Sequence, residues 1–157
     1  MKKIILLLSV CFLFVFQGYT QTVPNEKVPA PVKEAFAKKF PAAANVQYEM
    51  EMKDYQVTFK DKGIGMSANF NPSGEWLGTE TIMIESDLPK DVLTSVATNF
   101  VGFVTTEITK LEGPDNVLNY EMNLTKGKEA YEVKFSPKGE ILKKTPLMNQ
   151  KEVKEKQ

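Results

Sequence analysis

Histidine and arginine are absent from this chain, and cysteine is nearly so. Its 157 residues include a single cysteine, at position 11, and twenty basic residues that are all lysine. Histidine is the commonest general base and the commonest metal ligand, and no Gly-x-Ser-x-Gly or Ser-x-x-Lys motif replaces it. A formal charge of zero without arginine also excludes nucleic-acid binding. We therefore expect no enzyme activity, no catalytic residues, no cofactor and no metal ion.

Residues 1–20 have the layout of a secretory signal peptide. Lys2 and Lys3 precede a mostly apolar run over 4–16, and small residues at 18 and 20 then precede Gln21. The run is short for a membrane span, so cleavage before Gln21 is favoured over an uncleaved anchor. The alternative for Cys11, which follows Leu-Ser-Val, is lipid attachment rather than removal with the signal. Export predicts a periplasmic or secreted protein of the bacterial envelope.

Two stretches of the chain repeat each other in the same order. Val28-Pro29, Val32, Phe36 and Phe40 recur as Leu88-Pro89, Val92, Val96 and Phe100, and Phe70-x-Pro-x-Gly-Glu-x-Leu77 recurs as Phe135-x-Pro-x-Gly-Glu-x-Leu142. Repetition at this scale indicates a duplicated structural unit. We predict one unit over 21–86, a second over 87–144, and a mobile tail at 145–157.

Hydrophobic periodicity assigns the elements inside each unit. Apolar residues at three- and four-residue spacing behind Pro29 and Pro89 predict helices that end near Phe40 and Phe100, with Asp87 placed to cap the second. Elsewhere the period is two, which predicts strands at 46–52, 55–60, 66–70, 76–84, 105–111, 118–124, 129–135 and 140–144.

The predicted fold class is α+β: a tandem duplication of a helix followed by a four-stranded antiparallel sheet, with the helices packed on one face. The predicted core consists of Phe36, Phe40, Val57, Phe59, Phe70, Val92, Val96, Phe100, Val133 and Phe135.

These motifs, taken in order, resemble the PepSY-like family of exported bacterial proteins, whose fold resembles that of the β-lactamase inhibitory protein. The matching pieces are the hydrophobic-Pro-x-x-Val helix closed by Phe40-Pro41, Tyr55-x-Val57-x-Phe59, Phe70-x-Pro-x-Gly-Glu-Trp-Leu77, and the second Leu-Pro helix. The resemblance covers roughly 28–144. It implies tandem helix-and-sheet units and no catalytic residues.

The sheet face that points away from the helices is the candidate binding surface. Leucine recurs at 77 and 142, so we expect Leu77 to point inward and Trp76 to point outward beside Ile141. An exposed tryptophan on a polar sheet is a typical interface anchor. The alternative is that Trp76 packs against the other repeat or under the loops. The predicted protein-binding residues are Gln56, Thr58, Lys60, Asn69, Trp76, Glu121, Asn123, Glu132, Lys134 and Ile141.

Two functions are compatible with these features. The first is an exported non-catalytic module that recognises another protein through the exposed sheet face and in doing so can act as an inhibitor. The second is a periplasmic carrier of a small apolar or peptide ligand held between the two repeats. A pocket lined by Met50, Met52, Met66 or Met83 would favour the carrier, and an open sheet would favour the protein-binding module.

Overall fold

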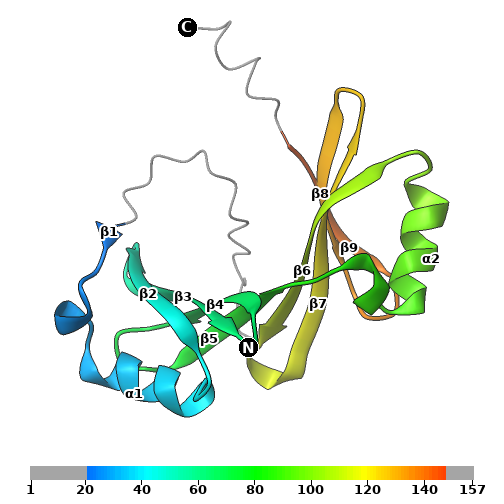
Figure 1. The fold of residues 1–157 in the computed structure, drawn as a ribbon. Coiled ribbons are helices and arrows are strands. Elements are labelled where there is room, and N and C mark those ends of the chain that lie inside the picture. Colours follow the sequence, from blue (N-terminus) through cyan, green and yellow to red (C-terminus); the bar gives the residue numbers. More distant parts are fainter. Residues whose placement is uncertain (1–20, 148–157) are drawn as a thin grey trace, which may run out of the picture.

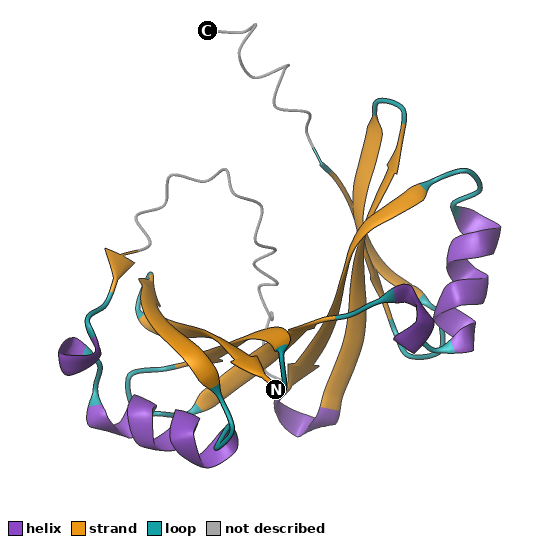
Figure 2. Cartoon of the chain, viewed as in Figure 1, coloured by secondary structure: helices purple, strands orange, loops and turns teal. Residues whose placement is uncertain are grey.

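The computed structural model describes residues 21–147 and shows two helices on a bent antiparallel sheet (Figures 1 and 2). The predicted signal peptide, with Cys11, and most of the predicted tail lie outside the described residues. The elements in chain order are β1 (Gln21–Thr22), η1 (Asn25–Lys27), α1 (Ala30–Lys39), β2 (Ala44–Glu51), β3 (Asp54–Asp61), β4 (Ile64–Phe70), β5 (Trp76–Ile82), η2 (Glu85–Asp87), α2 (Lys90–Asn99), β6 (Val104–Gly113), η3 (Pro114–Asn116), β7 (Val117–Lys126), β8 (Glu129–Phe135) and β9 (Ile141–Pro146).

The nine strands of the described residues form one sheet, in the order β1 to β9. β5 pairs with β6 from Thr79 opposite Glu112 to Ile82 opposite Thr109. The predicted fold class, with a separate four-stranded sheet in each unit, is therefore wrong. Periodicity shows where strands lie but not which edges pair. An open β5 edge would leave backbone N–H and C=O groups unpaired, and pairing with β6 satisfies them.

Both helices begin directly after a proline and end at a phenylalanine, as predicted. Pro29 and Pro89 stand at the N-caps, where the missing N–H of proline costs nothing. Asp87 does not cap α2, because it belongs to η2 and the α2 N-cap has no side-chain hydrogen bond. The N–H groups of Phe40 and Phe100 close the helices by donating to carbonyls four residues earlier, at 2.8 and 2.9 Å.

Each helix covers its own hydrophobic cluster on the sheet. The α1 cluster consists of Val28, Val32, Phe36, Tyr55, Val57, Phe59, Ala68 and Phe70. The α2 cluster consists of Leu88, Val92, Phe100, Ile108, Tyr120, Met122, Leu124, Val133 and Phe135. Every predicted core residue lies in or against one of these clusters, and only Phe40 and Val96 are partly exposed.

Glycine turns fasten the sheet to the first turn of each helix. Gly74, between β4 and β5, has φ 84°, and a Cβ there would stand 2.5 Å from the Pro31 carbonyl oxygen. Gly139, between β8 and β9, has φ 76°, and a Cβ there would collide with the Asp91 carbonyl oxygen. Only glycine combines this left-handed backbone with so close an approach.

Both helices lie on the same side of the sheet. In Figure 1 the sheet bends where β5 passes to β6, with α1 and α2 on the outer sides of the bend. The register agrees with this view: Phe70, Thr79, Glu112 and Leu118 lie on one face, which also carries both hydrophobic clusters. At the far edge, β9 includes Thr145 and Pro146, which pair with Glu132 and Tyr131, so the predicted tail begins two residues too early.

Candidate functional site

The helix-free side of the sheet lines the inside of the bend, and we call it the inner face (Figure 1). Its polar side chains follow one another across neighbouring strands, because residues paired opposite each other point to the same side. Thr58, Ser67 and Glu80 form such a row over β3, β4 and β5. Glu121 and Lys134 continue the face on β7 and β8. The inner face is therefore polar over most of its width.

The structure places eight of the predicted binding residues on this face: Gln56, Thr58, Lys60, Asn69, Glu121, Asn123, Glu132 and Lys134. Thr58 and Lys60 are exposed, as an open face requires. Others are buried, with exposed fractions of 6% for Gln56, 3% for Glu121, 6% for Asn123 and 9% for Glu132. The alternation assigned the correct side of the sheet but not this burial.

Trp76 and Ile141 do not belong to the inner face. Asn69 pairs with Gly78, yet Phe70 pairs with Trp76, so a β-bulge adds one residue to β5. An extra residue in one strand reverses the alternation and turns Trp76 to the α1 side. The same shift occurs in β9, where Lys134 pairs with Lys143 but Phe135 pairs with Ile141. The expectation that these two side chains point away from the helices is therefore wrong.

The indole of Trp76 completes the α1 cluster. It packs against that cluster, and its Nε1 donates a hydrogen bond of 2.9 Å to Thr79 Oγ1. Lys39 Nζ, from the last turn of α1, lies 3.6 Å from the ring centroid, which is a cation–π contact. Trp76 thus joins the end of α1 to β5.

Charged groups gather at the middle of the inner face. Lys134 Nζ lies 3.5 Å from Glu121 Oε2, and both side chains are largely buried. The pKa of Glu80 is raised to about 7, mainly by burial and then by the neighbouring charges of Glu121 and Glu51. Lys134 and a hydrogen bond with Ser67 act in the opposite direction and lower it. We call Glu51, Glu80, Glu121 and Lys134 the acidic cluster.

Sequence reasoning missed two members of this cluster. Alternation along 76–84 places Glu80 on the polar side, although Glu80 is not among the predicted binding residues. Glu51 lies at the end of β2, three strands from Glu80 in the sheet. Its charge nevertheless acts on Glu80, and no local pattern in the sequence reports proximity between residues of non-adjacent strands.

Replacing Glu80 with glutamine should stabilise the protein at high pH. The wild-type pKa stands at about 7 in the folded chain, against an ordinary value of 4.5. Stability is therefore greatest below 4.5 and is lost as pH rises toward and through 7, by about 3 kcal/mol. Glu80→Gln should show a gain of that order at pH 8.5 and almost none at pH 4, measured by urea unfolding at both values.

The control for this experiment is Glu34→Gln, because Glu34 is exposed on α1 and far from the cluster. Its unfolding free energy should follow that of the wild type at both pH values. A Glu80→Gln gain of equal size at pH 4 and pH 8.5 would mean that packing, rather than ionisation, is responsible.

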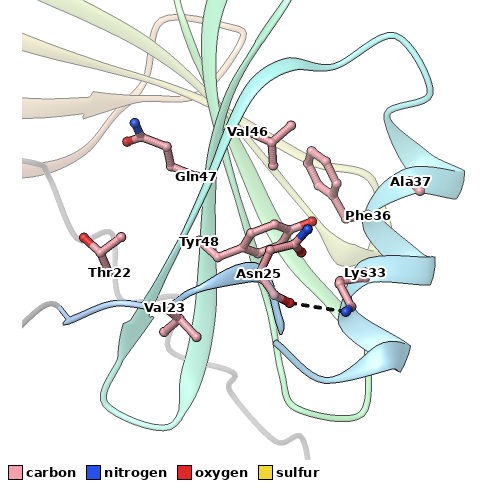
Figure 3. A pocket seen from close by; sticks show the side chains of 9 residues that line it. All are labelled: Thr22, Val23, Asn25, Lys33, Phe36, Ala37, Val46, Gln47 and Tyr48. Carbon is pink, nitrogen blue, oxygen red and sulfur yellow. Dashed lines mark hydrogen bonds between the residues drawn. The ribbon is translucent and has the colours of Figure 1, made fainter. Parts of the chain in front are cut away.

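A pocket of about 590 Å3 lies on the other side of the sheet, between α1 and β2 (Figure 3). Phe36, Val46 and Tyr48 give it apolar walls, and Lys33 Nζ at its rim donates to the Asn25 carbonyl oxygen at 3.2 Å. Burial raises the pKa of Tyr48. A carrier function predicted a pocket between the two repeats, lined by Met50, Met52, Met66 or Met83. None of these four residues lines the pocket beside Phe36.

Two further properties bear on function. Among residues 21–147, no group of three acidic side chains is arranged to hold a metal ion, so the acidic cluster is not a metal-binding geometry. Neither helix in this part of the chain is long and apolar enough to cross a membrane.

Known proteins resemble this chain both in sequence and in structure. A family model described as "Putative beta-lactamase-inhibitor-like, PepSY-like" matches residues 17–67 and 53–143. A Bacteroides eggerthii structure described as one of "putative periplasmic proteins" is 25% identical with a TM-score of 0.74, covering 78% of this chain and 91% of its own.

Two structures of lower identity share the fold. A BLIP-like protein from Bacteroides fragilis is 23% identical with a TM-score of 0.71, covering 81% of this chain and 89% of its own. A DUF2874 family protein from Bacteroides uniformis is 21% identical with a TM-score of 0.72, covering 75% and 88%. None of the curated proteins compared with the chain matches it. The two family matches together span most of the chain, confirm the resemblance noted in its motifs, and show that it belongs to the PepSY-like, beta-lactamase-inhibitor-like family.

Proposed function

We propose that this is an exported, non-catalytic protein that binds another protein through its inner face. The observation that carries the proposal is the inner face itself, a polar surface that crosses several strands and that neither α1 nor α2 covers. Its other side is fixed by two hydrophobic clusters, so its side chains are held on a rigid base. Rigid presentation of polar groups lowers the entropy that binding costs.

Location and chemistry support the same proposal. Residues 1–20 have the pattern of a secretory signal, and the Bacteroides eggerthii neighbour is described as periplasmic. The chain has no histidine, and its one cysteine lies within the predicted signal, which leaves few groups for catalysis. The family description favours inhibition as the consequence of binding, which would follow if the inner face covers the active site of its partner.

Site-specific photo-cross-linking in the exporting bacterium tests the proposal. A benzoylphenylalanine replacing Thr58, which is exposed on the inner face, should give a discrete adduct with one envelope protein. The same residue replacing Thr98, which is exposed on α2, should give little or none. Adducts that form equally from both positions, or mainly from Thr98, would show that the inner face is not the binding surface.

A further inference from the structure

We infer that the inner face receives a cationic side chain, a lysine or an arginine of the partner protein, at its acidic cluster. The inference rests on the proposed function and adds to it the chemistry of the partner. Three observations support it: an excess of buried negative charge, a buried acceptor that lacks a donor, and the position of both on neighbouring strands.

The first observation is the charge balance of the acidic cluster. Glu80 and Glu121 bring two carboxyl groups to the face, Glu51 acts on Glu80 from the end of β2, and Lys134 brings the ammonium group that contacts Glu121. Glu121 is 3% exposed, so water screens its charge poorly. Buried charge is costly unless an opposite charge compensates it. A second cation would restore the balance.

The second observation is a hydrogen-bond acceptor without a donor. Asn123 is 6% exposed, and its Nδ2 donates to Glu107 Oε2 at 2.8 Å. That bond fixes the orientation of the amide, and its Oδ1 is buried with no hydrogen-bond partner among residues 21–147. Across the strand pair stands Glu132, whose carboxylate is another acceptor. A buried acceptor of this kind needs an N–H or O–H donor.

The third observation is position. Asn123 and Glu121 are two residues apart on β7, so they point to the same side at a spacing of about 7 Å. Their partners on β8 are Glu132 and Lys134. A guanidinium carries five N–H donors in a flat fork, and an ammonium carries three. Either group can donate to a carboxylate and to an amide oxygen at the same time. A neutral side chain can donate hydrogen bonds but cannot compensate the negative charge of the carboxylate.

Binding of a cation has a consequence for Glu80. Its carboxyl group responds to Glu51 on β2, Glu121 on β7, Lys134 on β8 and a hydrogen bond from Ser67 on β4. A positive charge brought near it would lower its pKa from about 7 and release a proton. Affinity should therefore rise with pH between about 6 and 8.

The test uses two short capped peptides of identical sequence, one with a central arginine and one with citrulline, which is neutral but similar in shape. Each is titrated into the 15N-labelled protein without its signal peptide and followed by NMR. We expect the arginine peptide to shift amide signals of β5, β7 and β8 and to bind at least about tenfold more tightly, as charge-assisted hydrogen bonds require.

Variants locate the effect. Glu80→Gln should remove most of the preference for arginine and flatten its pH dependence, whereas Glu34→Gln on the exposed side of α1 should change neither. Equal binding of the two peptides, binding of neither, or shifts confined to the pocket beside Phe36 would overturn the inference. The cross-linking experiment remains independent: adducts from Thr58 without arginine preference would leave the proposed function standing and reject only the cationic side chain.

Discussion

Replacing Phe100 with alanine should lower the free energy of unfolding by about 3–5 kcal/mol, as expected for a fully buried phenylalanine. Phe100 is 4% exposed and ends α2. Its ring lies 5.7 Å from Phe103 and 6.2 Å from Phe135, both nearly perpendicular to it. Removing it would open a cavity where the helix meets the sheet. Urea unfolding followed by circular dichroism measures the loss.

Two comparisons make this result specific. Phe40 stands at the corresponding end of α1 but is only partly buried, so Phe40→Ala should cost less than Phe100→Ala. Val101 is 69% exposed, and Val101→Ala should change stability by no more than about 0.5 kcal/mol. A loss below about 0.5 kcal/mol in Phe100→Ala would mean that this helix end does not pack as described.

Gly139→Ala should be the most damaging glycine substitution, with a loss of about 2–5 kcal/mol. An alanine at φ 76° costs about 1–2 kcal/mol for its left-handed backbone. Its Cβ would also collide with the carbonyl oxygen of Asp91, and overpacking of this kind costs about 1–3 kcal/mol more. The collision would push the β8–β9 turn away from α2 and weaken the packing of the α2 cluster.

Gly127 provides the matched control. Its φ is 61°, but no atom of residues 21–147 outside its own chain neighbours lies within 4 Å of a Cβ built there. Gly127→Ala should therefore show only the backbone cost, about 1–2 kcal/mol, when both variants are unfolded in urea. Equal losses in the two variants would indicate that the β8–β9 turn moves aside and that contact with α2 is not required.

Periodicity predicted the elements well because it records burial directly. Val32 and Phe36 on one helical face, and Val57 and Phe59 on one strand face, are buried where the pattern placed them. Pairing between strands is a different matter. The sequence near Ile82 does not indicate whether β5 is an edge strand. Its pairing with β6 depends on the path that the chain takes through α2 before β6 begins.

The bulges explain the error at Trp76. The alternation through Asn69 and Gly78 is regular, and one additional residue at Leu77 then reverses it. A bulge of one residue changes no composition and breaks no hydrophobic run, so alternation alone assigns the wrong side. Unbroken alternation places Thr58 and Glu121 on the correct side of the sheet, but alternation alone does not report that Glu51, at the far end of β2, acts on Glu80.

The agreement between strand order and chain order has a consequence for how the protein folds. Each strand of the described chain after β1 pairs with the strand before it, so every strand pairing joins consecutive strands. The larger excursions, residues 23–43 and 83–103, each contain a helix. Loop closure is then inexpensive, and low contact order favours rapid folding for a protein so rich in strands. The sheet can grow one hairpin at a time, and each new strand covers the edge left open by the last.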